Sequence, residues 1–227
     1  MLRYSILLFT GLWLLSGCVD VTTSTQKSSR KPTPTPAPTP PSPPESAGGL
    51  YQKYSASNFR NAPEFKQQTN PSQINYRVLH TAMHFMVNEA RAKYGKPALP
   101  YNERLEVAAY FHSKRMAEQD FFSHKNPKSA SRRSTSDRAK LAGIANPFIA
   151  ENIVYTYTSS NPSYLDIGDA MMESWMNSSG HKSNILSNKG QAVGCGAYSS
   201  GKYWYGTQVF QWYKPVRNSD SPPKDHF

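Results

Sequence analysis

Apolar side chains recur at helical spacing in three stretches of the chain. Between residues 74 and 93 they form one stripe, and a Gly and a Pro follow within a few positions, as is common after helices. A second stripe over residues 103–119 follows Asn102, a residue type favoured at the helix N-cap. Residues 167–177 repeat the pattern a third time. We therefore predict three helices over these ranges, the last continuing as far as His181.

Extended runs rich in β-branched and aromatic residues occur in three other places. The last two are joined by a short Ser-Ser-Gly segment that favours a hairpin turn. Residues 125–147 are polar with a basic centre and no clear period, so we expect mostly loop there. The predicted strands cover residues 151–157, 192–198 and 203–213. Helices gathered around an antiparallel sheet predict one α+β domain over residues 72–214.

The N-terminus has the features of an export signal. Arg3 precedes an apolar run over residues 4–15, which is shorter than the ~20 residues that span a membrane. The Leu-Ser-Gly-Cys string that ends at Cys18 resembles the lipobox of bacterial lipoproteins. This resemblance implies that residues 1–17 are removed and that lipid on Cys18 anchors the protein in the cell envelope. Val19, where an Asp would imply inner-membrane retention, favours the outer membrane in a Gram-negative host.

Residues 18–71 are predicted to link the lipidated cysteine to the domain. Proline alternates with Thr and Ser over residues 32–44, which predicts a polyproline-II stalk ~40 Å long at ~3.1 Å per residue. Residues 45–70 are polar with a few aromatics, so they either pack loosely on the domain or are disordered. The polar residues 215–227 are predicted to form a disordered tail.

The chain is strongly basic, with a formal net charge of +11. The basic residues are scattered and form no basic helix or aromatic-basic repeat, which argues against nucleic acid as a partner. Anionic lipid head groups, acidic wall polymers or a protein are better candidates. A solvated basic surface without any partner is the alternative.

Three ionisable residues stand in apolar or small-residue settings. His124 follows two aromatic residues, Glu151 lies within an Ala-Glu-Asn-Ile string, and His181 follows a helix and a glycine. Such settings shift pKa values and are frequent at functional sites. His112 is expected to be a core residue. Cys195 lies between two glycines in a predicted strand, and we expect a buried, inert thiol.

These strings occur in an order that resembles the CAP superfamily, the cysteine-rich secretory, antigen and pathogenesis-related proteins. The resemblance runs from about His84 to Phe210 and is especially close to the bacterial subgroup over residues 175–186. It implies an α-β-α sandwich with an antiparallel sheet flanked by helices. It also implies a central cavity that in plant and animal members holds two His and two Glu, sometimes with a divalent metal.

Only half of that set carries over to this chain. His124 and Glu151 match the first His and the first Glu, whereas Ser178 and Tyr205 stand where the family has its second Glu and second His. The bacterial-type string supplies His181 in their place. The weaker cavity candidates are Ser178, Asn184 and Tyr205. Two imidazoles (His124 and His181), a carboxylate and a water would suit zinc.

Three functions remain open at this point. The favoured one is a membrane-tethered, non-catalytic module that binds a lipid, a wall component or a protein, because no nucleophile is identifiable. No Gly-x-Ser-x-Gly string surrounds Ser174 or Ser178. The second is a metal-assisted hydrolase in which His124, His181 and Glu151 hold a metal or activate water. The third is a structural scaffold.

Overall fold

The computed structural model describes residues 48–70 and 73–220. Contacts divide the chain into two units, residues 1–40 and 41–227, and all described residues belong to the second. The predicted signal peptide, Cys18, Val19 and the proline-rich stalk lie outside the described residues. Within the described part, no helix combines the length and apolar character that crossing a membrane requires.

Five helices surround the sheet. The predicted N-cap forms: the side chain of Asn102 accepts a hydrogen bond from the backbone N–H of Leu105. Asn75 caps the helix before it in the same way, because its side chain accepts from the backbone N–H of Val78. The predictions for the first two helices are confirmed to within a few residues. The helices are α3 (Tyr76–Lys93), α4 (Glu103–Glu118), α5 (Thr135–Leu141), α6 (Tyr164–Asn177) and α7 (Ser179–Ile185).

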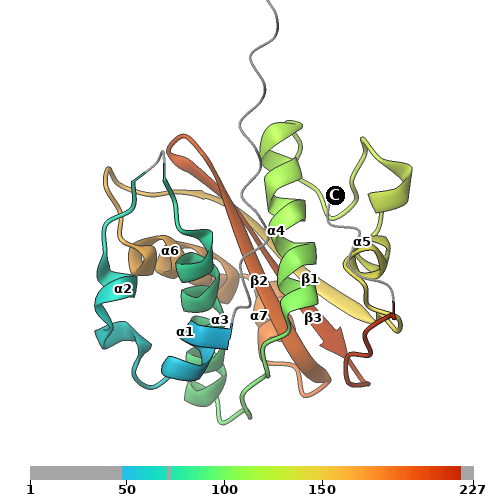
Figure 1. Cartoon of the computed structure of the whole chain (residues 1–227), viewed down its shortest axis with the longest axis horizontal. Coiled ribbons are helices and arrows are strands. Elements are labelled where there is room, and N and C mark those ends of the chain that lie inside the picture. Colours follow the sequence, from blue (N-terminus) through green and yellow to red (C-terminus); the bar gives the residue numbers. More distant parts are fainter. Residues whose placement is uncertain (1–47, 71–72, 221–227) are drawn as a thin grey trace, which may run out of the picture. The chain divides into compact units, whose positions relative to one another are not determined.

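The sheet has three antiparallel strands in the order β1-β3-β2. They are β1 (Ile149–Tyr157), β2 (Gly190–Ser200) and β3 (Tyr203–Trp212), so the three strand predictions and the hairpin are confirmed. Figure 1 shows the sheet between α3 and α6 on one side and α4 and α5 on the other. This is the α-β-α sandwich that the resemblance implies.

Two glycines of β2 bring α4 onto the sheet. A Cβ atom at Gly194 would collide with the backbone of Leu105 and Glu106, and one at Gly196 with the backbone of Tyr110. The α4 backbone therefore rests directly on β2, where any side chain would push it away. Apolar side chains fill the remaining space on both faces of the sheet, and the larger cluster lies on the α3 and α6 side.

The segment before the predicted domain is part of the fold. Residues 48–70 form α1 (Gly48–Lys53), a 3₁₀ turn η1 (Phe59–Asn61) and α2 (Pro63–Lys66). Phe59 and Phe65 are completely buried in the main core, and each such burial stabilises the fold by roughly 1.5–3 kcal/mol. The expectation of loose packing or disorder is therefore wrong for these residues, because their sparse apolar side chains are all used.

Residues 125–147 are mostly loop, as expected, but they also contain η2 (Ala130–Arg132) and α5. Two further predictions need correction. The helix expected to continue to His181 is interrupted, because Ser178 is extended between α6 and α7. The tail stays with the domain as far as residue 219: Asn218 bridges Ile144, and the Ser219 amide donates to the carbonyl of Gly143.

Candidate functional site

Glu151 is the centre of a polar cluster on β1. It lies opposite Val209 on the sheet face that α4 and α5 cover, and its side chain is only 2% exposed. A buried carboxylate is costly unless partners compensate its charge. The partners come from α5, from α4 and from the loop between these two helices.

Arg138 on α5 neutralises this carboxylate. Its Nη2 donates to Oε2 of Glu151 at 2.6 Å, and its own side chain is 3% exposed. A capping box fixes the start of α5: Ser134 and Asp137 exchange hydrogen bonds between side chain and backbone. Burial alone would raise the pKa of Glu151, but the Arg138 guanidinium and the bond from His124 outweigh it and hold the pKa below its usual value.

His124 connects this buried pair to solvent. Its Nδ1 lies 2.9 Å from Oε1 of Glu151, and its side chain is 52% exposed. Because a carboxylate only accepts hydrogen bonds, Nδ1 must carry the proton, and Nε2 of the neutral ring is left as an acceptor. The arrangement fixes the imidazole ring while leaving its outer edge available.

His112 lies beneath the cluster on α4. Its Nε2 is 3.9 Å from Oε1 of Glu151 and 3.1 Å from the carbonyl oxygen of Ser123. Burial lowers the pKa of His112 to about 4, so the ring is neutral at pH 7 and donates to that carbonyl. The expectation of a core histidine fits this placement.

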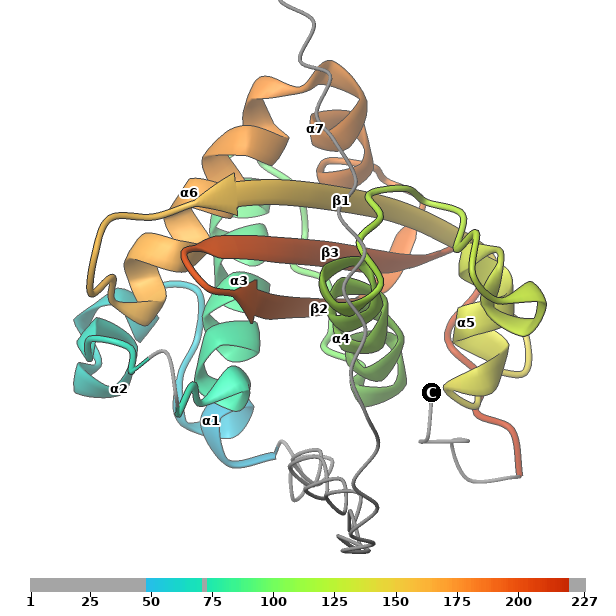
Figure 2. The same ribbon diagram turned by 90° about the horizontal axis from the view of Figure 1, so that it is seen from above.

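His181 belongs to α7, which lies along the β1 edge of the sheet (Figure 2). Its backbone carbonyl accepts from Asn152, whose side-chain oxygen accepts from Asn184. Burial and the neighbouring His124 lower the pKa of His181. His181 therefore lies within electrostatic reach of His124, although the helix that was expected to position it is broken.

The other candidates lie outside the cluster. Ser178 is half-buried in the break between α6 and α7, and its side chain does not cap α7. Asn184 belongs to the amide pair with Asn152 that holds α7 to β1. Tyr205 shares the sheet face of Glu151 but packs against Tyr155, which lies four residues beyond Glu151 on β1.

The donor set does not fit the zinc centre that the family resemblance suggests. Both oxygens of Glu151 are occupied, one by the Arg138 guanidinium and one by Nδ1 of His124. A cation beside this guanidinium would be repelled. Among the residues that the structure describes, no group of three or more His, Cys, Asp and Glu side chains is arranged to hold a metal ion.

Sequence reasoning missed Arg138, although a local signal was present. The Ser-Thr-Ser-Asp string at residues 134–137 is a helix-start pattern, and it predicts a helix that carries Arg138 one residue later. The ion pair between Arg138 and Glu151 joins α5 to β1, and no local sequence pattern predicts it.

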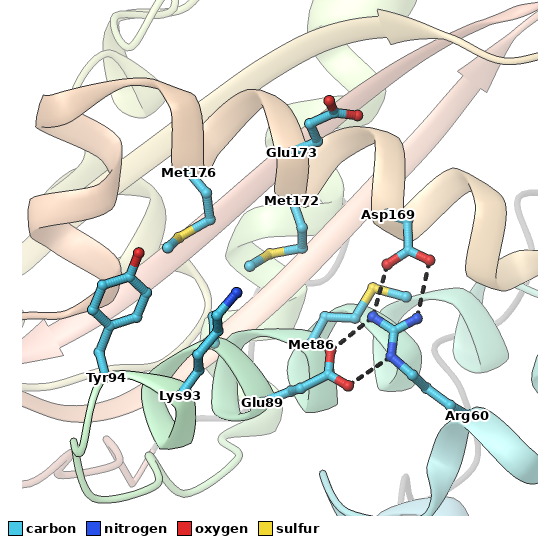
Figure 3. Close-up of a pocket in the computed structure, with 10 residues that line it drawn as sticks. Arg60, Met86, Glu89, Lys93, Tyr94, Asp169, Met172, Glu173 and Met176 are labelled. Carbon is cyan, nitrogen blue, oxygen red and sulfur yellow. Dashed lines mark hydrogen bonds and ion pairs between the residues drawn. The ribbon is translucent and has the colours of Figure 1, made fainter.

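A separate pocket of about 640 Å³ lies between α3 and α6. Figure 3 shows methionine side chains along it, with Arg60 at one end bridging Glu89 on α3 and Asp169 on α6. Lys93 and Tyr94 lie at the other end. The two carboxylates already satisfy Arg60, so this guanidinium ties α3 to α6.

Comparison with known proteins finds two uncharacterised bacterial relatives of the domain. YkwD, an uncharacterised protein of Bacillus subtilis, is 30% identical over 125 residues, which cover 55% of this chain and 44% of YkwD. YlbC, an uncharacterised membrane protein of the same organism, is 28% identical over 127 residues, which cover 56% of this chain and 33% of YlbC. The chain thus spans less than half the length of these relatives.

Solved structures with a similar fold include an extracellular protein with an SCP domain from Bacillus anthracis. It is 25% identical with a TM-score of 0.47, and the match covers 59% of this chain and 40% of that one. An outer surface protein from Borrelia burgdorferi is 14% identical with a TM-score of 0.49, and the match covers 62% of this chain and 97% of that one. The model of the cysteine-rich secretory protein family matches residues 84–213, which is more than half of the chain. The chain belongs to this family, the CAP family.

Proposed function

We propose that this protein is an envelope lipoprotein that presents its CAP domain as a non-catalytic binding module. The ligand binds at the polar cluster formed by His124, Glu151 and His181. The observation that carries this proposal is the state of Glu151: it is buried, paired with Arg138, and bonded to a histidine whose outer edge faces solvent.

This geometry disfavours catalysis by the carboxylate. A general base needs a free lone pair within reach of a substrate proton and a pKa near the working pH. Glu151 has both oxygens engaged and a lowered pKa. Its role is to orient His124, as a carboxylate behind a histidine commonly does.

The same geometry favours binding. A fixed imidazole with an open acceptor, next to a second half-buried imidazole, offers a preorganised pair of hydrogen-bonding groups. Protonation converts the acceptor nitrogen of either ring into a second N–H donor, so the pair can bind hydroxyl, carboxylate or phosphate groups.

The proposed lipid anchor and stalk are supported by the sequence alone. The lipobox-like string ending at Cys18 and the proline-rich stretch after it supply an anchor and a spacer. One relative, YlbC, is described as a membrane protein. A tethered module meets its ligand at a high local concentration, so weak contacts suffice. Replacing Cys18 by Ser is expected to move the protein from the detergent phase to the aqueous phase in a Triton X-114 partition.

The binding function is tested with the full chain in detergent against two host fractions, insoluble cell wall and vesicles of extracted lipid. His124→Ala with His181→Ala is expected to lower retention on one fraction by about tenfold or more. The control Lys182→Ala, next to His181, should bind like the wild type. The proposal would be overturned if the double histidine variant were retained as well as Lys182→Ala and the wild type. Release of a cleavage product from either fraction would also overturn it.

A further inference from the structure

A row of aromatic side chains, all exposed except the half-buried Tyr205, extends along the sheet beyond the polar cluster. Tyr155 and Tyr157 on β1 lie opposite Tyr205 and Tyr203 on β3. Phe122, from the loop after α4, joins them with its ring 6.2 Å from that of Tyr155. We call these five residues the aromatic strip.

The strip is exposed to an unusual degree for aromatic rings on a sheet. Tyr157 is 71% exposed and Phe122 is 52% exposed. The rings of Tyr155 and Tyr203 stack at 5.2 Å with an interplanar angle of 17°, and Tyr205 packs against Tyr155 at 4.8 Å. Contiguous exposed rings held rigidly in this way mark interaction surfaces.

The strip and the polar cluster share one face of the sheet. Side chains two residues apart on a strand share a face, so Glu151, Tyr155 and Tyr157 all lie on the α4 side of β1. Phe122 precedes His124 by two residues in the same loop. Phe122 therefore connects the strip to the loop that carries His124.

The polypeptide next to His124 is basic. Residues 125–140 contain six Lys or Arg and one Asp. Lys125, Lys128, Arg133 and Lys140 are exposed, and no described acidic side chain forms an ion pair with them. The single acid, Asp137, is engaged with Ser134 in the capping box of α5. This segment carries positive charge that the domain does not neutralise.

We propose that the aromatic strip and the basic segment bind an anionic polysaccharide, whose sugar rings lie on the tyrosines and whose acid groups face the lysines. This inference rests on the proposed binding function and names its ligand class. Flat aromatic faces attract the C–H faces of sugar rings, and tyrosine hydroxyls can bond to sugar hydroxyls. The imidazoles of His124 and His181 meet polar groups at the end of the strip.

The character of the strip favours a glycan over a lipid surface. Segments that lie in a membrane interface are commonly amphipathic helices with Trp, Phe and Leu on their apolar face. Here four of the five rings are tyrosines, and all four are fixed on strands of the central sheet. Binding to anionic vesicles is accordingly an outcome that opposes the proposal.

The test measures binding of the full chain in detergent to three soluble probes. Polygalacturonate has sugar rings and acid groups, a neutral galactan has only the rings, and polyglutamate has only the acid groups. Vesicles with phosphatidylglycerol are the fourth probe. The expected order is polygalacturonate first, with an affinity at least about tenfold above either partial probe, because rings and charges act together.

Variants separate the two contributions. Tyr155→Ala is expected to weaken polygalacturonate binding about tenfold and to leave polyglutamate binding unchanged, whereas Tyr155→Phe retains the ring and most of the affinity. Tyr94→Ala, an exposed tyrosine at the end of α3, is the matched control. Lys125→Gln with Lys128→Gln should weaken both acidic probes.

Three results would overturn the inference: equal affinity for polygalacturonate and polyglutamate, binding to the vesicles only, or no effect of Tyr155→Ala. The wall-retention test with His124→Ala and His181→Ala is independent of these probes. If retention still depends on the histidines while polygalacturonate fails to bind, the proposed function stands and the polysaccharide inference falls. If polygalacturonate binds but retention ignores the histidines, the proposed site falls.

Discussion

Two buried carboxylates at opposite edges of the sheet show how similar groups have different roles. Glu151 on β1 pairs with Arg138 and bonds to a histidine that is half open to solvent. Glu106 on α4, beside β2, also bonds to a histidine: Nδ1 of His80 lies 3.2 Å from its Oε1. Its other oxygen accepts from the hydroxyl of Tyr51 at 2.8 Å.

The two pairs differ in how many ring nitrogens of the histidine are hydrogen-bonded within the protein. Nε2 of His80 accepts from the backbone N–H of Ala197 at 3.0 Å, so both of its ring nitrogens are used inside the protein. His80 and Glu106 are each about 5% exposed, and α1 covers them with Tyr51. His124 keeps its second nitrogen free of such a bond and faces solvent. The closed pair stabilises the fold, whereas the open pair is available to a ligand.

The largest effect is expected from removing Arg138, the cation that pairs with Glu151. Arg138→Met leaves Glu151 buried without its charge partner, which costs about 3–5 kcal/mol of unfolding free energy. Urea denaturation at pH 7 measures this loss. Arg133→Met, an exposed neighbour, should change the value by less than about 0.5 kcal/mol. A loss below about 1 kcal/mol for Arg138→Met would mean that the ion pair does not matter in this way.

Acid is expected to weaken both regions, since a neutral buried histidine lies near each carboxylate. Burial lowers the pKa values of His84 and His112 to about 4, below the value near 6.5 of an unfolded chain. The unfolded state then binds more protons between pH 6.5 and 4, so stability falls as the pH falls through this window. Each histidine should cost about 1 kcal/mol between pH 7 and pH 5.5.

Urea midpoints of the wild type, His84→Gln and His112→Gln at these two pH values measure the effect. Each single variant should lose about half of the decrease. A wild-type stability that stays constant from pH 7 to pH 5.5 would contradict the assignment of neutral buried rings.

The smallest change in unfolding free energy is expected from replacing Tyr51, which covers the closed pair. Tyr51→Phe removes the hydroxyl that donates to Glu106 and leaves a buried oxygen without this partner, at a cost of about 1–2 kcal/mol. Thermal unfolding should report the loss, and Tyr94→Phe, an exposed position, should show none. If Tyr51→Phe also reduced ligand retention, the separation between a closed and an open pair would be wrong.

Much of the fold could be predicted because it depends on local patterns. The stripes that became α3 and α4, the strand runs and the hairpin are read within windows of a few residues, and they agree with the structure to within a few positions. The prediction for residues 48–70 was wrong because the few apolar residues of this segment have no period. Phe59 and Phe65 nevertheless pack in the core. Only tertiary contacts give such scattered side chains a place.

The candidate site could be predicted in part. His124, Glu151 and His181 were identified by their settings and by the family resemblance, and the structure brings the first two into contact. Arg138 was missed because its pairing joins two elements, and the closed pair was missed because its members come from three: Tyr51 from α1, His80 from α3 and Glu106 from α4.

The sequence by itself determined the main helices by their periodicity, the three strands by their composition, and family membership by ordered strings. Tertiary structure alone decided which histidine–carboxylate pair is sealed and which leaves its histidine open to solvent. The reason is physical, because burial and pairing arise from contacts between residues far apart in the chain. Glu151 meets His124 across 27 positions, and Tyr51 meets Glu106 across 55.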